Sequence, residues 1–309
     1  MKHQSVLVTG GAGFIGSHLV ELLLAKDYRV KVLDNLSQGR REFVPAAAEF
    51  IEGDLTNLGD CAEAVSGVDG VFHLAAMSRV LPSLDDIAGC TNPNVVGTQN
   101  ILMAARQAGV RRLVYSGSST YYGNQPTPHR EDMRPEFLNF YSLTKYVGEE
   151  YCGLFNRTMG LSTAVVRFFN VYGPRQPQSG NYALVIGIFL RRMALGLPLI
   201  IHGDGAQRRD FVHVRDAAAA ILRVFESDRR GEVFNVGSGT NYSVKQIADR
   251  ISALQIHEAR RGGDAEDTLA DIARIRELGW EPKVHFDAGL KELVEAALAP
   301  ETALAAALE

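Results

Sequence analysis

The chain has 309 residues, enough for one large domain or two closely packed ones with a substantial core. Its 46% hydrophobic and 22% charged residues are typical of a soluble globular protein, and a net charge of −4 excludes the basic footprint of a nucleic-acid-binding protein. The three cysteines are too few and too dispersed for a disulfide framework or a zinc site, so we expect no metal and a reducing cytoplasm. A strand that begins by Val6 leaves no room for a signal peptide, and no apolar run is long enough to cross a bilayer.

Apolar strand-like runs alternate with amphipathic helix-like segments through the first half of the chain. The runs SVLVTG, RVKVLD, EFIEGDL, GVFHLA and RRLVYSGS predict strands, and GSHLVELLLAK and Thr98–Ala108 predict two of the helices between them. The segment TAVVRFFNVYG is expected to continue the sheet. This alternation is typical of an α/β fold, here a Rossmann-type doubly wound parallel sheet with helices on both faces.

The pattern changes after Tyr172, where four turn-forming residues interrupt it: Pro174, Pro177, Gly180 and Asn181. We therefore expect the segment up to about Arg209 to leave the sheet. The run DFVHVRDAAAAILRVFE is predicted to return to it, and further helices are predicted near Val244–Leu254 and Ala288–Ala299.

Two structural units are expected from this order of elements. Residues 1–170, with a return segment at about 211–236, are predicted to form an NAD-binding Rossmann domain. Residues 171–210 and 237–303 are predicted to form a smaller, mixed α/β lobe that binds the substrate. The final residues 305–309, AAALE, are interpreted as a cloning remnant.

A glycine-rich turn joins the first strand to the first helix. Gly10, Gly13 and Gly16 follow SVLVT with the spacing Gly-x-x-Gly-x-x-Gly, which lets the backbone approach a pyrophosphate at the helix N-terminus. Asp34 ends the next strand, about 20 residues on, where a carboxylate accepts hydrogen bonds from an adenosine ribose and repels a 2′-phosphate. The turn therefore predicts NAD rather than NADP, against the alternative of a plain turn followed by a strand-ending Asp.

Tyr141 and Lys145 stand four residues apart in FYSLTKYVGEEY, which places them on one face of a helix. A Lys ammonium beside a phenol lowers the pKa of the phenol, and the phenolate can then take a proton from a sugar hydroxyl while hydride leaves the carbon. The segment YSGSSTYYG, at the end of a preceding strand, supplies hydroxyls that orient a substrate: Ser116, Ser118, Ser119 and Thr120. A solvated loop is the alternative for these serines.

Ordered motifs along almost the whole chain are similar to one family. The motifs occur in the order VTGGAGFIGSHL, DNLSQGR, EGDL, HLAA, NPNVVGT, YSLTK, RFFNVYGPRQ, FNVGSG and RRGGD. On these motifs the chain resembles the extended short-chain dehydrogenase/reductases that act on nucleotide sugars, and most of all the UDP-glucose 4-epimerases. The resemblance implies an NAD cofactor that is held tightly and recycled in place.

The resemblance also implies which residues contact that cofactor. The pyrophosphate, adenosine and nicotinamide contacts, in chain order, are Gly10, Gly13, Phe14, Ile15, Asp34, Asn35, Ser37, Gly39, Asp54, Leu55, Leu74, Ala75, Ala76, Asn94 and Ser116. Lys145 is implied to bind the nicotinamide ribose and to tune Tyr141. Asp54 alone, without the resemblance, is equally compatible with an ordinary strand-ending loop.

Substrate contacts follow from the same resemblance. Ser118, with Ser119 beside it, matches the hydroxyl that hydrogen-bonds the sugar 4-OH, and Asn170 matches an amide that contacts the diphosphate. Arg209 and Arg261 match two arginines that bind the diphosphate, and Asp264 matches a carboxylate that binds the uridine ribose. His202 matches a residue beside the uracil, and Thr268 matches a residue beside the sugar. A core histidine is at least as good a reading of His202.

The implied reaction is inversion at carbon 4. Tyr141 removes the 4-OH proton as hydride passes to NAD, the 4-keto sugar turns over within the site, and hydride and proton return on the other face. Dehydrating relatives carry Asp-Glu at the positions of Ser119 and Thr120, and decarboxylating relatives carry Glu at the position of Thr120, whereas this chain has hydroxyls at both. An epimerase is therefore the first expectation.

The sugar stays open at this point. Thr268 is small, so an N-acetyl or carboxyl substituent also fits, whereas Asn170 disfavours a glucuronate. Either Arg191 or Arg192 is a candidate partner for a carboxylate at carbon 6, and Arg192 is the first choice. The alternative is that both arginine side chains are exposed to solvent. UDP-glucose and UDP-galactose come first, followed by UDP-glucuronate and UDP-N-acetylglucosamine.

Two hypotheses of other classes remain: a net oxidoreductase on a nucleotide sugar, and a non-catalytic NAD or nucleotide-sugar binding module on the same fold. The intact Tyr141, Lys145 and Ser118 disfavour the second of these. By family analogy we expect a homodimer formed through two helices of the cofactor domain, and no nucleic-acid or membrane partner.

Overall fold

The computed structural model describes residues 4–78, 80–180, 183–259 and 265–299. Its centre is a seven-stranded parallel sheet with the strand order β10-β6-β5-β4-β1-β2-β3. The strands are β1 (Ser5–Thr9), β2 (Arg29–Asp34), β3 (Glu49–Glu52), β4 (Gly70–His73), β5 (Arg112–Ser118), β6 (Ser162–Phe168) and β10 (Val233–Val236). The order reverses between β1 and β4, so a doubly wound fold is confirmed, with its crevice at the carboxyl ends of these two strands.

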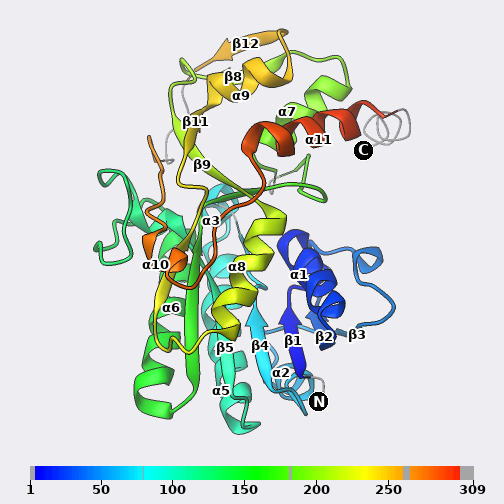
Figure 1. Cartoon of the computed structure of the whole chain (residues 1–309), viewed down its shortest axis with the longest axis vertical. Helices are drawn as coiled ribbons and strands as arrows, with labels where there is room; N and C mark the ends of the chain where they lie inside the picture. Colours follow the sequence, from blue (N-terminus) through cyan, green and yellow to red (C-terminus); the bar gives the residue numbers. More distant parts are fainter. Residues whose placement is uncertain (1–3, 79, 181–182, 260–264, 300–309) are drawn as a thin grey trace.

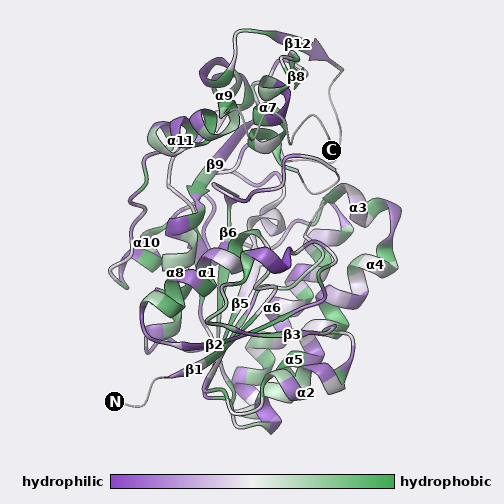
Figure 2. Ribbon diagram, turned by 90° about the vertical axis from the view of Figure 1, so that its right-hand side faces the viewer, coloured by the Kyte–Doolittle hydropathy of each residue, from purple (hydrophilic) through white to green (hydrophobic). Residues whose placement is uncertain are grey.

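Helices cover both faces of this sheet. α1 (Phe14–Ala25) packs against α8 (Val214–Glu226) on one face, while α2 (Leu58–Ala64), α5 (Thr98–Gln107) and α6 (Phe140–Met159) lie on the other (Figure 1). Strands such as β1, β4 and β5 are almost wholly buried, because helices cover both of their faces. Figure 2 shows the resulting layers, with hydrophobic strands between the helices.

Short helices border the carboxyl end of the sheet. They are η1 (Arg41–Phe43), α3 (Val80–Asp85), α4 (Ile87–Thr91), the π-helical η2 (Asn92–Gly97), η3 (Ser119–Tyr122) and α10 (Ala273–Arg276). The segment η2 runs directly into α5, so the helix predicted at Thr98 begins with a π-helical stretch on its N-terminal side. π-helical segments recur at functional sites because the extra residue redirects side chains.

A second lobe lies above the sheet in Figure 1. It contains α7 (Val185–Ala194), α9 (Val244–Ile251), α11 (Phe286–Leu298), the two-stranded sheet of β12 (Gln255–Glu258) and β8 (Leu199–His202), and the three-stranded sheet of β11 (Asn241–Ser243), β9 (Arg208–His213) and β7 (Asn170–Tyr172). Its own core is built around large side chains that include Phe189, Phe211 and Phe286.

Two strand predictions need correction. TAVVRFFNVYG does not stay in the large sheet, because the chain forms β6 and then β7, which pairs with β9. The run that starts DFVHV does not return as a strand, because β9 pairs with β7 and β11 and the place beside β6 is occupied by β10. The return is made by α8, which packs on α1, and then by β10. No helix among the described residues combines the length and apolar content needed to span a bilayer.

Candidate active site

The glycine turn lies between β1 and α1. Gly10 has φ +71°, and a Cβ there would lie 2.8 Å from the backbone nitrogen of Ala75, so a side chain has no room. Gly13 is the N-cap of α1 without a side-chain cap, and the first turn of the helix carries no acidic residue. The first turn of α1, which contains Phe14 and Ile15, therefore offers N–H groups without a side-chain cap, and the positive end of the helix, to a dinucleotide phosphate.

Asp34 is held beside this turn at the end of β2. Its carboxylate accepts hydrogen bonds from the backbone of Ala12 at 3.0 Å and of Leu36 at 2.9 Å, and a Cβ on Gly39 would lie 2.9 Å from Oδ1. Burial raises the pKa of Asp34, and the two backbone bonds oppose that shift. Each oxygen keeps a further lone pair, so the carboxylate can still accept the hydroxyls of an adenosine ribose.

The loops after β2 and β3 meet. Asn35 Nδ2 donates to Asp54 Oδ2 at 2.8 Å, and Ser37 donates its backbone N–H to Asn35 Oδ1 at 3.1 Å. Burial raises the pKa of Asp54, but the bonds from Thr56 and Asn35 outweigh it and the net shift is downward. The structure thus brings three predicted adenosine contacts together, while the Leu55 side chain is buried in the core next to Gly97.

The loop after β4 lies against the glycine turn. The N–H groups of Leu74 and Ala75 each donate to Thr9 Oγ1 at 3.2 Å. Asn94, fully buried in η2, holds the next part of this loop, because it exchanges hydrogen bonds of 2.8 and 2.9 Å with the backbone of Met77. Ala76 lies between these anchored positions, and Ser116 is half-buried on β5.

Ser118 closes β5, and Tyr141 opens α6. Ser118 caps η3 by accepting from the backbone of Thr120, and its Oγ lies 2.9 Å from Thr120 Oγ1, while Ser119 is buried beside it. α6 is capped by Asn139, and the N–H of Tyr141 donates to Ser83 Oγ at 3.2 Å. Because α6 packs on β5 and β6, the predicted catalytic residues gather at one end of the sheet.

Lys145 is almost fully buried one turn along α6 from Tyr141, with only 3% of its surface exposed. Its Nζ lies 4.2 Å from the centroid of the Tyr115 ring, a cation–π contact. Burial lowers the pKa of Lys145 to about 7, partly offset by Cys152, Cys90 and Glu149. A buried lysine with a lowered pKa, next to a predicted catalytic phenol, is typical of a functional site.

Three of the predicted substrate residues lie on or beside the small sheet of β7, β9 and β11. Asn170 is paired with Phe211, Arg209 with Tyr242, and the backbone of Thr268 donates to Arg208 O at 3.1 Å. Thr268 is buried and its hydroxyl accepts from the backbone of Asp210 at 3.3 Å, so it lies directly beneath β9. His202 is half-buried at the end of β8. The predicted contacts Arg261 and Asp264 lie outside the described residues.

Arg192 lies on the last turn of α7. Its Nε donates to Pro198 O at 2.5 Å, and with Arg191 it lines a surface hollow that is also bordered by Gln178, Ser179 and Leu197. None of the predicted catalytic residues lines that hollow. A role of Arg192 at the sugar therefore stays a prediction.

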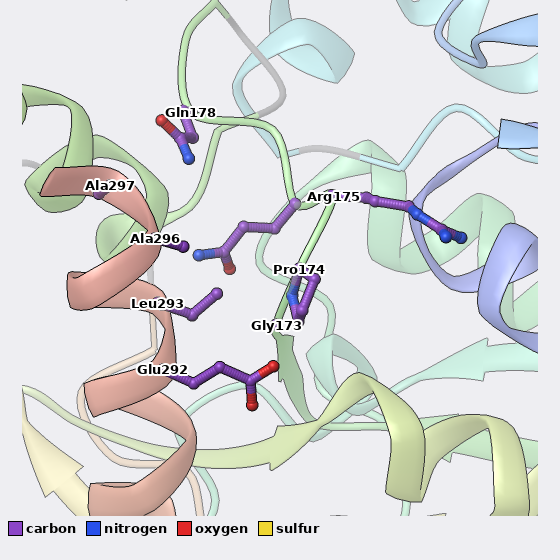
Figure 3. Close-up of a pocket in the computed structure, with 9 residues that line it drawn as sticks. Gly173, Pro174, Arg175, Gln178, Glu292, Leu293, Ala296 and Ala297 are labelled. Atoms are coloured by element: carbon purple, nitrogen blue, oxygen red, sulfur yellow. The ribbon is translucent and has the colours of Figure 1, made fainter. Parts of the chain in front are cut away.

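Arg175 connects the segment after β7 to α1, a contact that was not predicted from the sequence. Its backbone is left-handed with φ +65°, and its guanidinium reaches α1, where it donates to Ser17 Oγ at 3.1 Å and pairs with Glu21. Arg175 also lines a cavity together with Pro174, Gln178 and residues of α11, and Figure 3 shows its side chain extending away from α11. The segment after β7 is thereby tied to the helix that follows the glycine turn.

Comparisons with known proteins agree with this geometry. The model of the NAD dependent epimerase/dehydratase family matches residues 6–237. The chain is 38% identical to the UDP-glucose 4-epimerase of Mycolicibacterium smegmatis, over 94% of this chain and 97% of that protein.

Two solved structures are similar over nearly the whole chain. The UDP-glucose 4-epimerase of Thermotoga maritima with UDP-glucose has a TM-score of 0.91 and 35% identity, over 99% of this chain and all of that one. The UDP-N-acetylglucosamine 4-epimerase of Methanobrevibacter ruminantium with UDP-N-acetylmuramic acid has a TM-score of 0.91 and 32% identity, over 96% and 98%. With its glycine turn fitted to a dinucleotide, the chain therefore belongs to the NAD dependent epimerase/dehydratase family and uses NAD as its cofactor.

Proposed function

We propose that this protein is a UDP-hexose 4-epimerase that interconverts UDP-glucose and UDP-galactose through a transient 4-keto sugar, with NAD retained between turnovers. The observation that carries the proposal is the placement of Tyr141 and buried Lys145 on α6, beside Ser118 at the carboxyl end of β5. The similarity to UDP-glucose 4-epimerases over nearly the full chain supports it.

The proton chemistry belongs to Tyr141. Its phenolate accepts the 4-OH proton, and the Ser118 hydroxyl holds the same sugar oxygen by a hydrogen bond. The positive charge of Lys145, one helical turn away, stabilises the phenolate. Bound NAD would supply the reversible hydride transfer at carbon 4. Tyr141 then returns the proton to the new alcohol.

Turning of the sugar requires an anchor that does not move with it. Arg209 and Asn170 lie on adjacent strands of the small sheet and are proposed to hold the diphosphate. Charge-assisted hydrogen bonds from an arginine are strong enough to keep the nucleotide in place while the glycosidic end rotates. We extend this anchor to Arg261, with Asp264 on the uridine ribose.

The loop at the carboxyl end of β5 favours epimerisation over elimination or decarboxylation. Ser119 and Thr120 present no carboxyl group in η3, so no acid stands there to expel water. The Arg167 guanidinium lies over the Tyr121 ring of η3 and is paired with Glu149. The keto sugar accordingly has one course in this site, which is reduction.

We also propose a cytoplasmic homodimer. Leu143 and Leu154 are exposed on α6 with 42% and 46% of their surface accessible, and they are eleven positions apart, about three helical turns. A helix of the cofactor domain with such an apolar stripe suits the dimer contact expected from the family. The three cysteines are free and buried, as suits a reducing compartment. Light scattering after gel filtration measures the oligomeric state.

Proton NMR of the purified protein in D2O, without added cofactor, tests the proposed reaction. UDP-glucose, UDP-N-acetylglucosamine and UDP-glucuronate are supplied in separate tubes, and Tyr141→Phe is the control. We expect conversion of UDP-glucose to its C4 epimer, fastest of the three, without deuterium at carbon 4. Faster conversion of another sugar overturns the glucose assignment alone. No conversion in any tube, with NAD shown to be bound, overturns the epimerase.

A further inference from the structure

A buried chain of hydrogen bonds crosses the point where the strand order reverses. Thr9 ends β1 and His73 ends β4, and the two residues are direct neighbours in the parallel pairing. Thr9 Oγ1 lies 2.8 Å from His73 Nδ1, and His73 Nε2 lies 3.0 Å from Thr98 Oγ1 at the start of α5. All three side chains are at most 1% exposed.

The direction of these bonds is determined by counting hydrogens. The hydroxyl of Thr98 donates its one proton to Asn94 O at 2.6 Å, so it can only accept from His73 Nε2–H. His73 Nδ1 is then the unprotonated nitrogen and accepts from the hydroxyl of Thr9. Thr9 in turn accepts from two backbone N–H groups, those of Leu74 and Ala75. The N–H of Leu74 is shared with Thr9 O, also at 3.2 Å, and neutral His73 occupies a single tautomer.

The same chain continues to the catalytic helix. Asn94 Nδ2 donates to Thr144 Oγ1 at 3.0 Å, and the Thr144 hydroxyl donates to the carbonyl oxygen of Tyr141 at 3.0 Å. Asn94 Oδ1 accepts from the backbone of Met77, and the two Nδ2 hydrogens face three acceptors: Met77 O, Thr144 Oγ1 and, at 3.5 Å, Cys90 Sγ. A flipped amide would lose these bonds, so the side chain has one orientation.

We propose that this switch-point chain, formed by Thr9, His73, Thr98, Asn94 and Thr144, sets the position of the Tyr141 turn relative to the glycine turn that holds NAD. The inference rests on the proposed function for the role of Tyr141. The members other than Asn94 are positioning residues, since they act through the backbone of Leu74, Ala75 and Tyr141 rather than on the substrate. A shift of the phenol away from the nicotinamide side slows both proton and hydride transfer, because transfer rates depend steeply on alignment.

The surroundings of His73 keep it neutral. Burial and the nearby Lys145 cation lower the pKa of His73 to about 3. The Tyr115 ring, with its centroid 5.5 Å from that of His73, packs against it from β5. A doubly protonated ring would present an N–H to Thr9 and add a second buried cation next to Lys145, so the chain's direction is retained across the working pH range.

Two matched threonine variants test the positioning role. Thr144 and Thr163 are both buried, and each donates its hydroxyl proton to a carbonyl of α6, that of Tyr141 and that of Cys152 respectively. We expect Thr144→Val to lower kcat about tenfold or more with KM for the UDP-sugar within about twofold, and Thr163→Val to leave kcat within about twofold. Equal kcat losses in the two variants, or a loss confined to KM, would overturn the proposal.

Two measurements are independent of turnover. In amide hydrogen exchange, Thr144→Val is expected to speed exchange in the Tyr141–Lys145 turn about tenfold relative to Thr163→Val, and equal protection contradicts the proposal. In ¹⁵N-histidine NMR, with His73→Gln for assignment, His73 is expected as the neutral Nε2–H tautomer, and the Nδ1–H form or an imidazolium contradicts it. If the wild type converts no sugar, only the proposed function is overturned, because these two measurements still report whether the switch-point chain of hydrogen bonds forms.

Discussion

Glu149 on α6 and Arg167 on β6 form a two-bond ion pair in the interior of the protein. Arg167 Nε donates to Glu149 Oε2 at 3.1 Å and Nη2 donates to Oε1 at 2.6 Å, with both side chains 6% exposed. The guanidinium also donates to the Tyr122 hydroxyl at 2.8 Å and stacks over the rings of Tyr121 and Tyr122. One side chain thereby joins the helix of Tyr141 and Lys145 to the loop that follows Ser118.

Glu149→Gln is expected to lower the free energy of unfolding by about 3–5 kcal/mol, because it leaves the Arg167 cation buried without a counter-charge. Chemical denaturation measures the loss. The exposed pair of Arg229 and Glu232 supplies the control, since Glu232→Gln should cost no more than about 1 kcal/mol. The double variant Glu149→Leu/Arg167→Met should recover part of the stability, and a larger loss in the double than in the single variant contradicts this account.

Tyr141→Phe is expected to reduce kcat by about 10²- to 10⁴-fold, the usual worth of a positioned acid–base group. NAD should stay bound, since the ring is retained and only the hydroxyl is removed. Steady-state kinetics with cofactor quantification measures both. Tyr146→Phe, further along α6 with its ring packed edge-on to Tyr121, is the matched control and should keep kcat within about twofold. Comparable loss in both variants would show that the Tyr141 hydroxyl has no special role.

Lys145→Met is expected to abolish turnover and yet stabilise the cofactor-free protein at pH 7. The folded pKa of Lys145, about 7, lies below its ordinary value of 10.5, so the unfolded chain binds the proton more tightly between these limits. The wild type is therefore penalised at and below pH 7 and gains stability as the pH rises towards 10.5. We expect an advantage for the variant on the order of 1–4 kcal/mol at pH 7 that shrinks towards pH 10. Unfolding measured across this range checks it, and a pH-independent difference would contradict the burial of a titrating amine.

Asp34→Asn is expected to weaken NAD binding about tenfold or more and to reduce the preference over NADP. An amide has one acceptor oxygen, so it cannot accept from both Ala12 and Leu36 as the carboxylate does, and it no longer repels a 2′-phosphate. Titration of the cofactor-free protein with each nucleotide measures the change. Asp69→Asn, at the opposite end of the sheet where Asp69 accepts from the backbone of Ser5, is the control. An unchanged ratio of the affinities for NAD and NADP would show that Asp34 does not contact the adenosine ribose.

Local features of the chain were predictable from the sequence because they depend on neighbours. The glycine turn, the strand-ending Asp34 and the Tyr141–Lys145 spacing each lie within one strand–turn–helix unit, where backbone freedom and helical periodicity decide the outcome. The alternation of apolar runs likewise predicted strands β1 to β6 of the large sheet, but it did not predict β10. Asn170, Arg209 and Thr268 were placed by resemblance, and the structure brings them to one small sheet.

Tertiary structure alone decided how distant segments meet. No local pattern distinguishes β9 from a strand of the large sheet, because the partner of a strand depends on which sheet edge is unoccupied. Here β10 occupies the edge beside β6, and β9 pairs with β7 instead. Thr9 and His73 are 64 positions apart, and Arg112 bonds to a carbonyl 117 positions away. Hydrogen bonds of this kind form only after strands and helices pack, when buried polar groups must find partners or destabilise the fold. The sequence by itself thus determined the candidate reactive residues and the cofactor turn, whereas packing determined the buried network and ion pair that hold them in place.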